Sequence, residues 1–351
     1  MNLFSVEMKA VTWQKDSHGL FDYETQLLTI EKHVIQQQQK VYRLGQEVST
    51  YSPDSEQDES QQYLTTVQEQ GNKFYINPEG CEENENFLIV RSLKNSQGGQ
   101  KGYKMEPGDI IKLGRMEYVI METKDKDNLV NQASSELLKD QFEQTASYVT
   151  SSSAICRFCL MDTQTLEDPF ISPCNCKGSC QFVHFNCMRQ WIESRCQIKQ
   201  LNNAQSYRLK QQQCELCESL LPLKIRMDDK ELSLDVIQRP STPYLIMQSR
   251  HKKEKKQGKA VYVIQFQNGE PIKIGRGHQC DIQISDISVS RLHAYIKYQD
   301  GNFVILDNNS KFGTLVKLFQ AYRIEEEKVA VQVGRTVLTF VLKQQCTSEN
   351  H

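Results

Sequence analysis

The sequence ICRFCLMDTQTLEDPFISPCNCKGSCQFVHFNCMRQW (residues 155–191), followed by CELC (residues 214–217), decides the fold of this region. Seven of its cysteines and one histidine form pairs in the order Cys-x-x-Cys, Cys-x-Cys, His-x-x-Cys and Cys-x-x-Cys. A thiolate is a strong zinc ligand, and two intervening residues let one tight turn place both sulfurs on the same tetrahedral ion. The pairs predict two zinc ions held by Cys156, Cys159, Cys174, Cys176, His184, Cys187, Cys214 and Cys217.

The bulk composition indicates several modules in a reducing compartment. A chain of 351 residues is too long for one ordinary core. Its 42 Lys and Arg nearly balance its 44 Asp and Glu, for a net charge of -2, so nucleic acid binding is unlikely. No apolar run resembles a signal peptide or approaches the roughly 20 residues that span a bilayer, so we expect a soluble protein of the cytoplasm or nucleus. Reduced thiols are then expected at the five cysteines outside the ligand set, Cys81, Cys180, Cys196, Cys280 and Cys346.

Changes in composition divide the chain into five segments. Short β-rich runs separated by Gln, Asn and Gly clusters predict a β domain at 13–123. A linker helix is predicted within 124–154, where Leu137, Leu138 and Phe142 follow a possible cap at Ser134. The cysteine module occupies 155–226, and a linker at 227–259 carries the basic run HKKEKK (251–256). Alternating runs at 260–343 predict a β-sandwich.

The two β regions contain two pairs of weakly similar short sequences. Tyr42 to Gln46 parallels Ile272 to Arg276, and Leu113-Gly114-Arg115 parallels Val333-Gly334-Arg335. Two interpretations stay open, a diverged duplication and a chance likeness.

The cysteine module resembles a RING-CH finger. The stretches PCNCKGS (173–179) and CMRQWI (187–192) match that family's signature. Plant-homeodomain fingers share the ligand order but place a tryptophan just before the last pair, whereas Trp191 here follows Cys187. The resemblance implies a cross-brace, in which one zinc takes Cys156, Cys159, His184 and Cys187 and the other takes Cys174, Cys176, Cys214 and Cys217.

Four protein ligands on each ion leave no open position for water, so the zinc is expected to be structural. RING-type fingers hold a ubiquitin-conjugating enzyme, and the resemblance implies a docking surface of Phe158, Trp191 and Pro222. The alternative is that Phe158 and Trp191 form only the finger's small core. In two respects the chain departs from the family. Glu218 stands where many active members have a basic residue, and no transmembrane helices follow the finger.

The last segment resembles a forkhead-associated (FHA) domain. The likeness rests on Gly275-Arg276, on SRLH (290–293) and on DNNSKFGT (307–314). Such domains are β-sandwiches whose loops bind phosphothreonine, and the resemblance assigns the phosphate to Arg276, Ser290, Arg291 and Lys311. It gives structural roles to Gly275, His293 and Gly313.

Phe312 replaces the asparagine usual in that family, and the alternative interpretation is a decayed pocket on an intact sandwich. The first β region has Gln46 in place of the arginine and no Ser-x-x-His, so we expect it to have lost phosphate binding. An interaction or dimerisation surface is the remaining expectation for it.

Together these features predict a multidomain, mainly β chain, with an FHA-like β-sandwich at each end, the first degenerate, flanking a cross-braced two-zinc finger. The leading functional hypothesis is a soluble RING-type ubiquitin-protein ligase. Its partners would be a ubiquitin-conjugating enzyme and phosphothreonine-containing proteins. The alternative is a non-catalytic phosphoprotein-binding adaptor whose finger only binds proteins.

Overall fold

The structure is a computed structural model, and its strands form two compact units. It describes residues 4–14, 20, 22, 27–55, 60–80, 85–94, 97–127, 129–133, 145–149, 154–209, 213–222, 224–227, 230–250, 259–267, 269–325 and 328–344. One unit comprises Met1–Tyr118 and Asn268–His351, and the second comprises Val119–Gln267.

The first unit draws its strands from both ends of the sequence. Its hydrogen-bonded strand orders are β9-β25-β7-β27-β28-β1-β2, β26-β6-β5-β3-β4 and β22-β21-β23-β24-β8. The bounds are β1 (Phe4–Trp13), β2 (Leu28–Ile35), β3 (Gln39–Leu44), β4 (Glu47–Tyr51), β5 (Gln62–Gln70), β6 (Lys73–Asn77), β7 (Asn86–Ile89), η1 (Val90–Ser92), β8 (Tyr103–Lys104), β9 (Ile110–Leu113), β21 (Ile272–Gly275), β22 (Ile282–Gln283), β23 (Ala294–Gln299), β24 (Asn302–Asp307), β25 (Thr314–Lys317), β26 (Tyr322–Ile324), β27 (Val329–Val333) and β28 (Thr336–Gln344).

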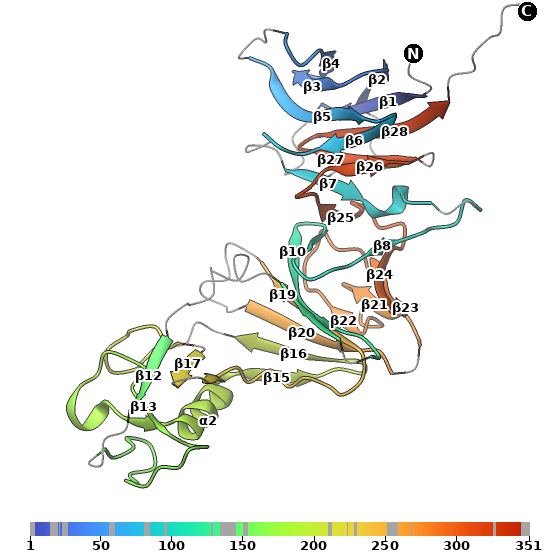
Figure 1. Ribbon diagram of the computed structural model, residues 1–351. Coiled ribbons are helices and arrows are strands. Elements are labelled where there is room, and N and C mark those ends of the chain that lie inside the picture. Colours follow the sequence, from blue (N-terminus) through green and yellow to red (C-terminus); the bar gives the residue numbers. More distant parts are fainter. Residues whose placement is uncertain are drawn as a thin grey trace, which may run out of the picture. The chain divides into compact units, whose positions relative to one another are not determined.

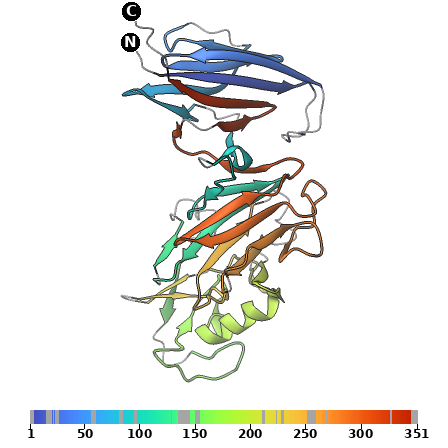
Figure 2. The same cartoon turned by 90° about the vertical axis from the view of Figure 1, so that its right-hand side faces the viewer.

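The last three strands of the sequence complete the sheets of the first region. β28 runs antiparallel to β1 from Phe4 opposite Gln344 to Thr12 opposite Thr336. β27 pairs with β7, and β26 pairs with β6. Figure 1 shows these red strands among the blue ones, and Figure 2 shows the same arrangement from the side.

The first region in turn supplies strands to the sheets of the last segment. β8 pairs with β24, and β9 pairs with β25, with Thr314 opposite Leu113. The predicted mainly β fold is therefore confirmed, but strands from each end of the chain complete the sheets of the other end. The five segment boundaries stay predictions of where the modules begin and end.

Burial alternates along the paired strands as the sandwich requires. On β1 the side chains of Val6, Met8 and Ala10 are buried, and Phe340 on the neighbouring β28 is fully buried. Successive side chains of a strand point to opposite faces, so these alternating apolar residues define one core-facing surface.

The paired glycines of the two similar sequence stretches have the same backbone conformation in one pair of turns and different conformations in the other. Gly114 and Gly334 both adopt a left-handed backbone, with φ of 59° and 54°, at the turns that follow β9 and β27. Gly45 has a φ of 62° in the turn between β3 and β4, whereas Gly275 has no positive φ. Space explains Gly275 instead, because a Cβ there would lie 2.4 Å from the Arg291 carbonyl oxygen.

The second unit contains the cysteine module and the strands that precede and follow it in the sequence. Its elements are β10 (Met116–Lys124), which begins in the first unit, β11 (Val130–Gln132), β12 (Thr145–Val149), β13 (Phe170–Ile171), η2 (Gly178–Cys180), β14 (Val183–His184), α2 (Phe185–Arg195), β15 (Gln197–Gln200), β16 (Ala204–Leu209), β17 (Lys224–Met227), β18 (Lys230–Ser233), β19 (Tyr244–Ser249) and β20 (Lys259–Gln265). Within the described residues, no helix is both long and apolar enough to cross a membrane.

A hairpin inserted in the cysteine module extends this unit's sheet. β15 and β16 leave the end of α2, and β16 pairs with β20 from Ala204 opposite Ile264 to Leu209 opposite Lys259. Tyr207 of β16 is buried among Tyr244, Ile246 and Val263. The stretch between the third and fourth ligand pairs is therefore a structural connection between finger and sheet.

The predicted linker helix falls on residues that the structure does not describe. Ser134, Leu137, Leu138 and Phe142 lie in the undescribed stretch 134–144, and the basic run at 251–256 is likewise outside the described residues. The strand β12 follows the first of these stretches.

We expect Gly102→Ala to destabilise the chain far more than Gly98→Ala. Both glycines have a left-handed φ, 73° and 78°, so both substitutions carry similar backbone strain, about 1–2 kcal/mol. Only at Gly102 would the new methyl meet the exchanged strand β24, at 2.6 Å from Val304 Cγ1 and 2.9 Å from the Ile305 carbonyl oxygen. Denaturant unfolding of both variants measures the difference, and equal losses of stability would contradict the packing of the β8 segment on β24.

Candidate functional site

The first predicted ligand group comes together in the second unit. Two ligands lie in the loop that begins at Cys156, His184 ends β14, and Cys187 lies in the first turn of α2. The donor atoms of Cys156, Cys159, His184 and Cys187 all lie within 4.8 Å of one another. Sulfurs on one tetrahedral zinc are about 3.8 Å apart, given zinc–sulfur bonds of about 2.3 Å, so this group has the size and chemistry of a zinc site.

His184 is held with one nitrogen toward the thiols and the other away from them. Its Nδ1 lies 3.2 Å from Cys159 Sγ and 3.8 Å from Cys187 Sγ. Its Nε2 is 2.7 Å from the Thr163 carbonyl oxygen. A carbonyl can only accept, so Nε2 carries the proton and Nδ1 is free to ligate a metal. The Phe170 ring stacks on the imidazole at 4.4 Å and fixes its plane.

The second ligand group has four thiols and a positive charge beside them. The sulfurs of Cys174, Cys176, Cys214 and Cys217 lie within 4.8 Å of one another. Arg157 Nη1 lies 3.6 Å from Cys174 Sγ and 3.8 Å from Cys214 Sγ, and it donates to the Cys180 carbonyl at 3.0 Å. Four thiolates on one Zn²⁺ leave a net charge of about −2, and this guanidinium offsets part of it.

The two Cys-x-x-Cys turns have the same backbone geometry. Leu160 N donates to the Cys156 carbonyl and Glu218 N donates to the Cys214 carbonyl, each at 2.9 Å. Leu160 and Glu218 both follow the second cysteine and have left-handed φ values of 61° and 57°. The eight predicted ligands therefore lie in the two interleaved groups that a cross-brace implies, and they suit two zinc ions.

Hydrogen bonding favours the thiolate form of one of these cysteines, Cys217. Bonds from Ser219, its hydroxyl first, lower the pKa of Cys217 to about 6 in the metal-free chain. Ser219 Oγ lies 3.1 Å from Cys217 Sγ and also accepts from Asn175 N at 3.3 Å. Zinc binds the thiolate, so this serine favours the ligating form near neutral pH.

The predicted docking residues differ in their exposure. Phe158 is 39% exposed and stacks on the half-buried Trp191, with ring centroids 6.2 Å apart. The Arg195 guanidinium lies 4.3 Å from the other ring and forms an ion pair with Glu215. Pro222 is buried. Leu216, 64% exposed, was not predicted, although it holds the same place in the second Cys-x-x-Cys turn that Phe158 holds in the first, and this equivalence could have marked it.

The cysteines outside the ligand set do not join either group where the structure describes them. Cys180 and Cys196 are partly buried free thiols of the second unit. Cys280, in the first unit, donates to the Arg291 carbonyl at 3.1 Å. Cys81 and Cys346 lie outside the described residues.

In the first unit, three loops that follow β21, β22 and β24 meet around Ser290. Arg276 N donates to the Ser290 carbonyl at 2.9 Å, and Lys311 N donates to Ser290 Oγ at 3.0 Å. Gly277 N donates to the Arg291 carbonyl at 2.8 Å. The four residues predicted for the phosphate therefore lie on loops that are joined by hydrogen bonds from backbone N–H groups.

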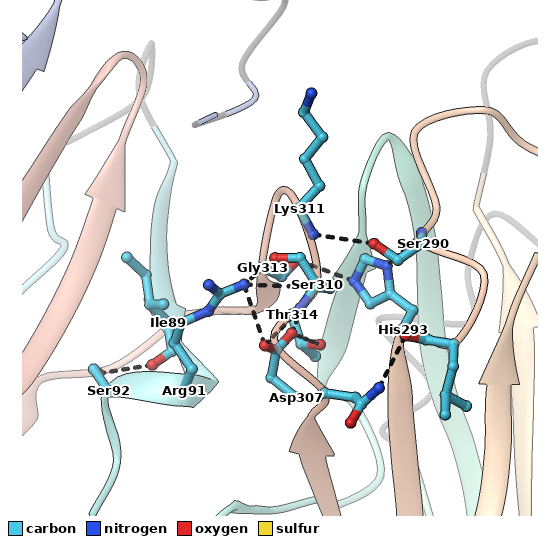
Figure 3. A network of polar contacts seen from close by, with 12 residues as sticks. Ile89, Arg91, Ser92, Ser290, His293, Asp307, Ser310, Lys311, Gly313 and Thr314 are labelled. Atoms are coloured by element: carbon cyan, nitrogen blue, oxygen red, sulfur yellow. Dashed lines mark hydrogen bonds and ion pairs between the residues drawn. The ribbon is translucent and has the colours of Figure 1, made fainter. Parts of the chain in front are cut away.

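The buried His293 side chain is hydrogen-bonded to two of these loops. Burial lowers the pKa of its imidazole, so the ring is neutral near pH 7. Ser290 N donates to Nδ1 at 3.1 Å, and Nε2 donates to the Gly313 carbonyl at 3.2 Å (Figure 3). The ring thus ties the Ser290 loop to the Lys311 loop, as its predicted structural role requires.

The side chains of the four predicted phosphate ligands differ in what they contact. Arg276 is exposed and its Nε donates to the Val289 carbonyl at 3.1 Å. Arg291 is exposed. Lys311 Nζ lies 3.3 Å from Asp22 Oδ2, a carboxylate that an incoming phosphate would have to displace. In the first region, Gln46 accepts from the Thr29 hydroxyl at 2.7 Å and offers no positive charge.

Comparisons with known proteins agree with these two sites. Residues 156–217 match the RING-variant domain, and residues 272–339 match the FHA domain. The chain is 30% identical over 103 residues to the E3 ubiquitin-protein ligase MARCHF7 of Pongo abelii, which is 29% of this chain and 13% of that protein. It is 48% identical over 48 residues to the E3 ubiquitin-protein ligase MARCHF8 of Homo sapiens, which is 14% of this chain and 16% of that protein.

The chain thus covers less than a fifth of the length of these relatives, and no solved structure matches it. The chain therefore contains a RING-variant domain with two sites suited to zinc, together with an FHA domain.

Proposed function

We propose that this chain is a RING-type ubiquitin-protein ligase that binds a ubiquitin-conjugating enzyme through its finger and phosphothreonine-containing partners through its FHA domain. The supporting observation is the pair of four-ligand groups within the RING-variant match. Four protein ligands saturate each tetrahedral ion, so the metal shapes a binding surface and takes no part in the transfer. The named activity of the MARCHF7 and MARCHF8 relatives supports the same proposal.

In this proposal the reacting groups belong to the partners. A target amine attacks the thioester carbonyl on the conjugating enzyme, the cysteine thiolate of that enzyme leaves, and an amide bond forms. The finger supplies orientation only. Holding reactants in a productive geometry is a large source of rate enhancement in enzymes, so no nucleophile of this chain is needed.

We propose that the conjugating enzyme docks on Phe158 and Trp191. Their stacked rings lie between two cations, since Arg157 lies 5.1 Å from the Phe158 ring and Arg195 lies 4.3 Å from the Trp191 ring. An aromatic pair with arginines is typical of the few residues that dominate a protein interface. The exposed Leu216 of the same finger is a further apolar candidate for this surface, whereas Pro222 is buried.

We propose that the phosphate is bound by Arg276, Ser290, Arg291 and Lys311. Arg276 and Arg291 are exposed cations, and the Ser290 hydroxyl lies where two loops join. A phosphate dianion accepts several charge-assisted hydrogen bonds, and exposed guanidinium groups can provide them. The ion pair between Lys311 and Asp22 is exposed enough for a phosphate to replace the carboxylate.

Trp191→Ala is the direct test of the docking surface. We expect binding of the cognate conjugating enzyme to weaken about 30-fold, because truncating a central aromatic residue typically costs about 2 kcal/mol. Two zinc ions per chain should remain. The matched control is Ile198→Ala, an exposed apolar residue on β15 of the same unit.

Two outcomes would contradict the docking role. Loss of zinc or unfolding in Trp191→Ala would show that the ring only fills the finger's core, against which it packs in part. An equal, small effect of Trp191→Ala and Ile198→Ala would place the docking surface elsewhere.

A non-catalytic phosphoprotein adaptor is the second candidate, and Glu218 favours it. This exposed acidic residue follows the last zinc ligand, in a left-handed backbone position. If Glu218→Arg raises ubiquitin transfer from an inactive level while conjugating-enzyme binding is unchanged, the native finger is an adaptor. Measurable transfer by the native chain would exclude this candidate.

A further inference from the structure

Arg91 of η1 reaches into the base of an FHA loop whose residues are more than two hundred positions away. Its guanidinium Nη2 lies 3.2 Å from Asp307 Oδ2 and donates to the Ser310 carbonyl. It also lies 3.4 Å from Ser310 Oγ. Figure 3 shows this side chain meeting the loop from the side opposite to His293. The residue lies directly after β7, outside the stretch that matches the FHA domain.

Asp307 forms the ion pair with Arg91 and accepts hydrogen bonds from Ser310 and Thr314; we call these three residues of the loop, Asp307, Ser310 and Thr314, the hub. The Asp307 side chain is fully buried, at 0% exposure. Oδ1 accepts from Ser310 Oγ at 2.6 Å and from Thr314 Oγ1 at 2.8 Å, and Oδ2 accepts from Ser310 N at 3.2 Å. A buried carboxylate needs a positive partner, and within the described residues Arg91 forms the ion pair with Asp307.

The hub and the phosphate loops are continuous through the backbone. Ser310 is directly followed by Lys311, whose N–H donates to Ser290 Oγ at 3.0 Å. Gly313, which precedes Thr314 in the sequence, accepts from His293 through its carbonyl oxygen. A shift of the Ser310 carbonyl would therefore move these two hydrogen bonds, which join the Lys311 loop to the Ser290 loop together with those from Asn308 to the His293 and Leu292 carbonyls.

Arg91 is placed by the exchange of strands between the two sandwiches. β7, which precedes η1, pairs with β25 from Leu315 opposite Ile89 to Lys317 opposite Phe87. β25 begins at Thr314, the last residue of the hub. The same register that closes the sheet thus brings the arginine to the carboxylate.

We propose that Arg91 is a positioning residue of the FHA phosphate site, which makes that site dependent on the amino-terminal region of the chain. This inference rests on the proposed phosphothreonine binding. Arg91 acts through Asp307 and Ser310 to hold the Lys311 N–H against Ser290 Oγ. The phosphate then meets a loop that is already in place, and little ordering accompanies binding.

The test uses the full chain and a phosphothreonine peptide selected from a degenerate library on the wild type. Arg91→Met is expected to raise the Kd of that peptide at least tenfold, and Arg91→Lys is expected to recover part of the loss because it restores the charge but not the fork of donors. The amide resonance of Lys311 should shift in Arg91→Met without peptide present. The matched control is Arg335→Met, which removes a guanidinium bonded to backbone carbonyls of Gly45 and Gln14. It should leave the Kd within about twofold, as expected for a residue away from the interface.

If Arg91→Met does not fold, the double variant Arg91→Met with Asp307→Asn is measured instead, because it removes both charges of the ion pair and keeps an oxygen acceptor for the Ser310 and Thr314 hydroxyl groups. Its Kd should stay at least tenfold raised. Wild-type affinity in either variant, or equal effects of Arg91→Met and Arg335→Met, overturns the positioning role. If the wild type selects no phosphothreonine peptide, the proposed function itself fails, which separates the two failures.

Discussion

Cys156→Ser should abolish the finger's structure and every activity that depends on it. A hydroxyl replaces a thiolate in the first ligand group, where the donor atoms lie within 4.8 Å. Structural zinc in small fingers is worth about 10–16 kcal/mol of apparent binding free energy near neutral pH, far more than the finger's few buried apolar residues can replace. We expect zinc content to fall from two ions per chain to one or fewer, measured by metal analysis of the purified chain.

Cys180→Ser is the matched control for this prediction. Cys180 lies in the same finger and belongs to neither ligand group, and it meets Arg157 only through its carbonyl oxygen. It should keep two zinc ions. Equal zinc loss in both variants, or full zinc content in Cys156→Ser, would contradict the assignment of the first site.

Arg276→Ala should weaken phosphothreonine peptide binding about ten- to hundredfold. Hydrogen bonds to charged groups contribute about 1.5–3 kcal/mol each, and the exposed guanidinium has its Nε on the Val289 carbonyl with the other nitrogens available to a ligand. Binding of the peptide selected on the wild type, measured by calorimetry, checks the change.

Lys273→Ala controls for the loss of a positive charge. Lys273 is an exposed cation three residues before Arg276, on β21. Its substitution should change the Kd less than about twofold, as is usual for exposed residues away from a binding site. If unphosphorylated and phosphorylated peptides bind the wild type equally, the phosphate site is absent whatever the variants do.

The zinc ligands could be predicted from sequence because their pattern is local. Paired ligands two residues apart enforce the same turn wherever they occur, and the turns at Cys156 and Cys214 indeed share their hydrogen bonds and left-handed residues. The FHA loops were predictable for the same reason, since Ser290 and His293 are bonded to each other within one turn.

The exchange of strands could not be predicted in this way. Alternation of apolar residues marks β1 and β28 as strands, but it does not say that Phe4 pairs with Gln344. The alternation would be the same if these strands paired with other neighbours, because it reports only which face of a strand is buried. Pairing at this separation is a property of the folded chain.

Arg157 and Arg91 each support one of the two sites, but only one of them could have been found from the sequence. Arg157 could have been found, because it lies between two zinc ligands and meets the thiols of the other group. Arg91 could not, because its partner Asp307 is brought to it only by the register of β7 on β25. Sequence motifs name the residues that touch a ligand more readily than those that hold them in place.

Phosphorylation-directed ubiquitin transfer is the central claim, and one assay tests it most directly. The full chain is incubated with ubiquitin, activating enzyme, a panel of conjugating enzymes and a lysine-containing target peptide that carries either phosphothreonine or threonine. With at least one conjugating enzyme, and at target concentrations below the Kd, we predict faster modification of the phosphorylated target by about tenfold or more, in proportion to its affinity. Arg276→Ala should remove that preference and Cys156→Ser should remove the transfer. Absence of transfer with every conjugating enzyme, or equal rates for the two targets, would contradict the account.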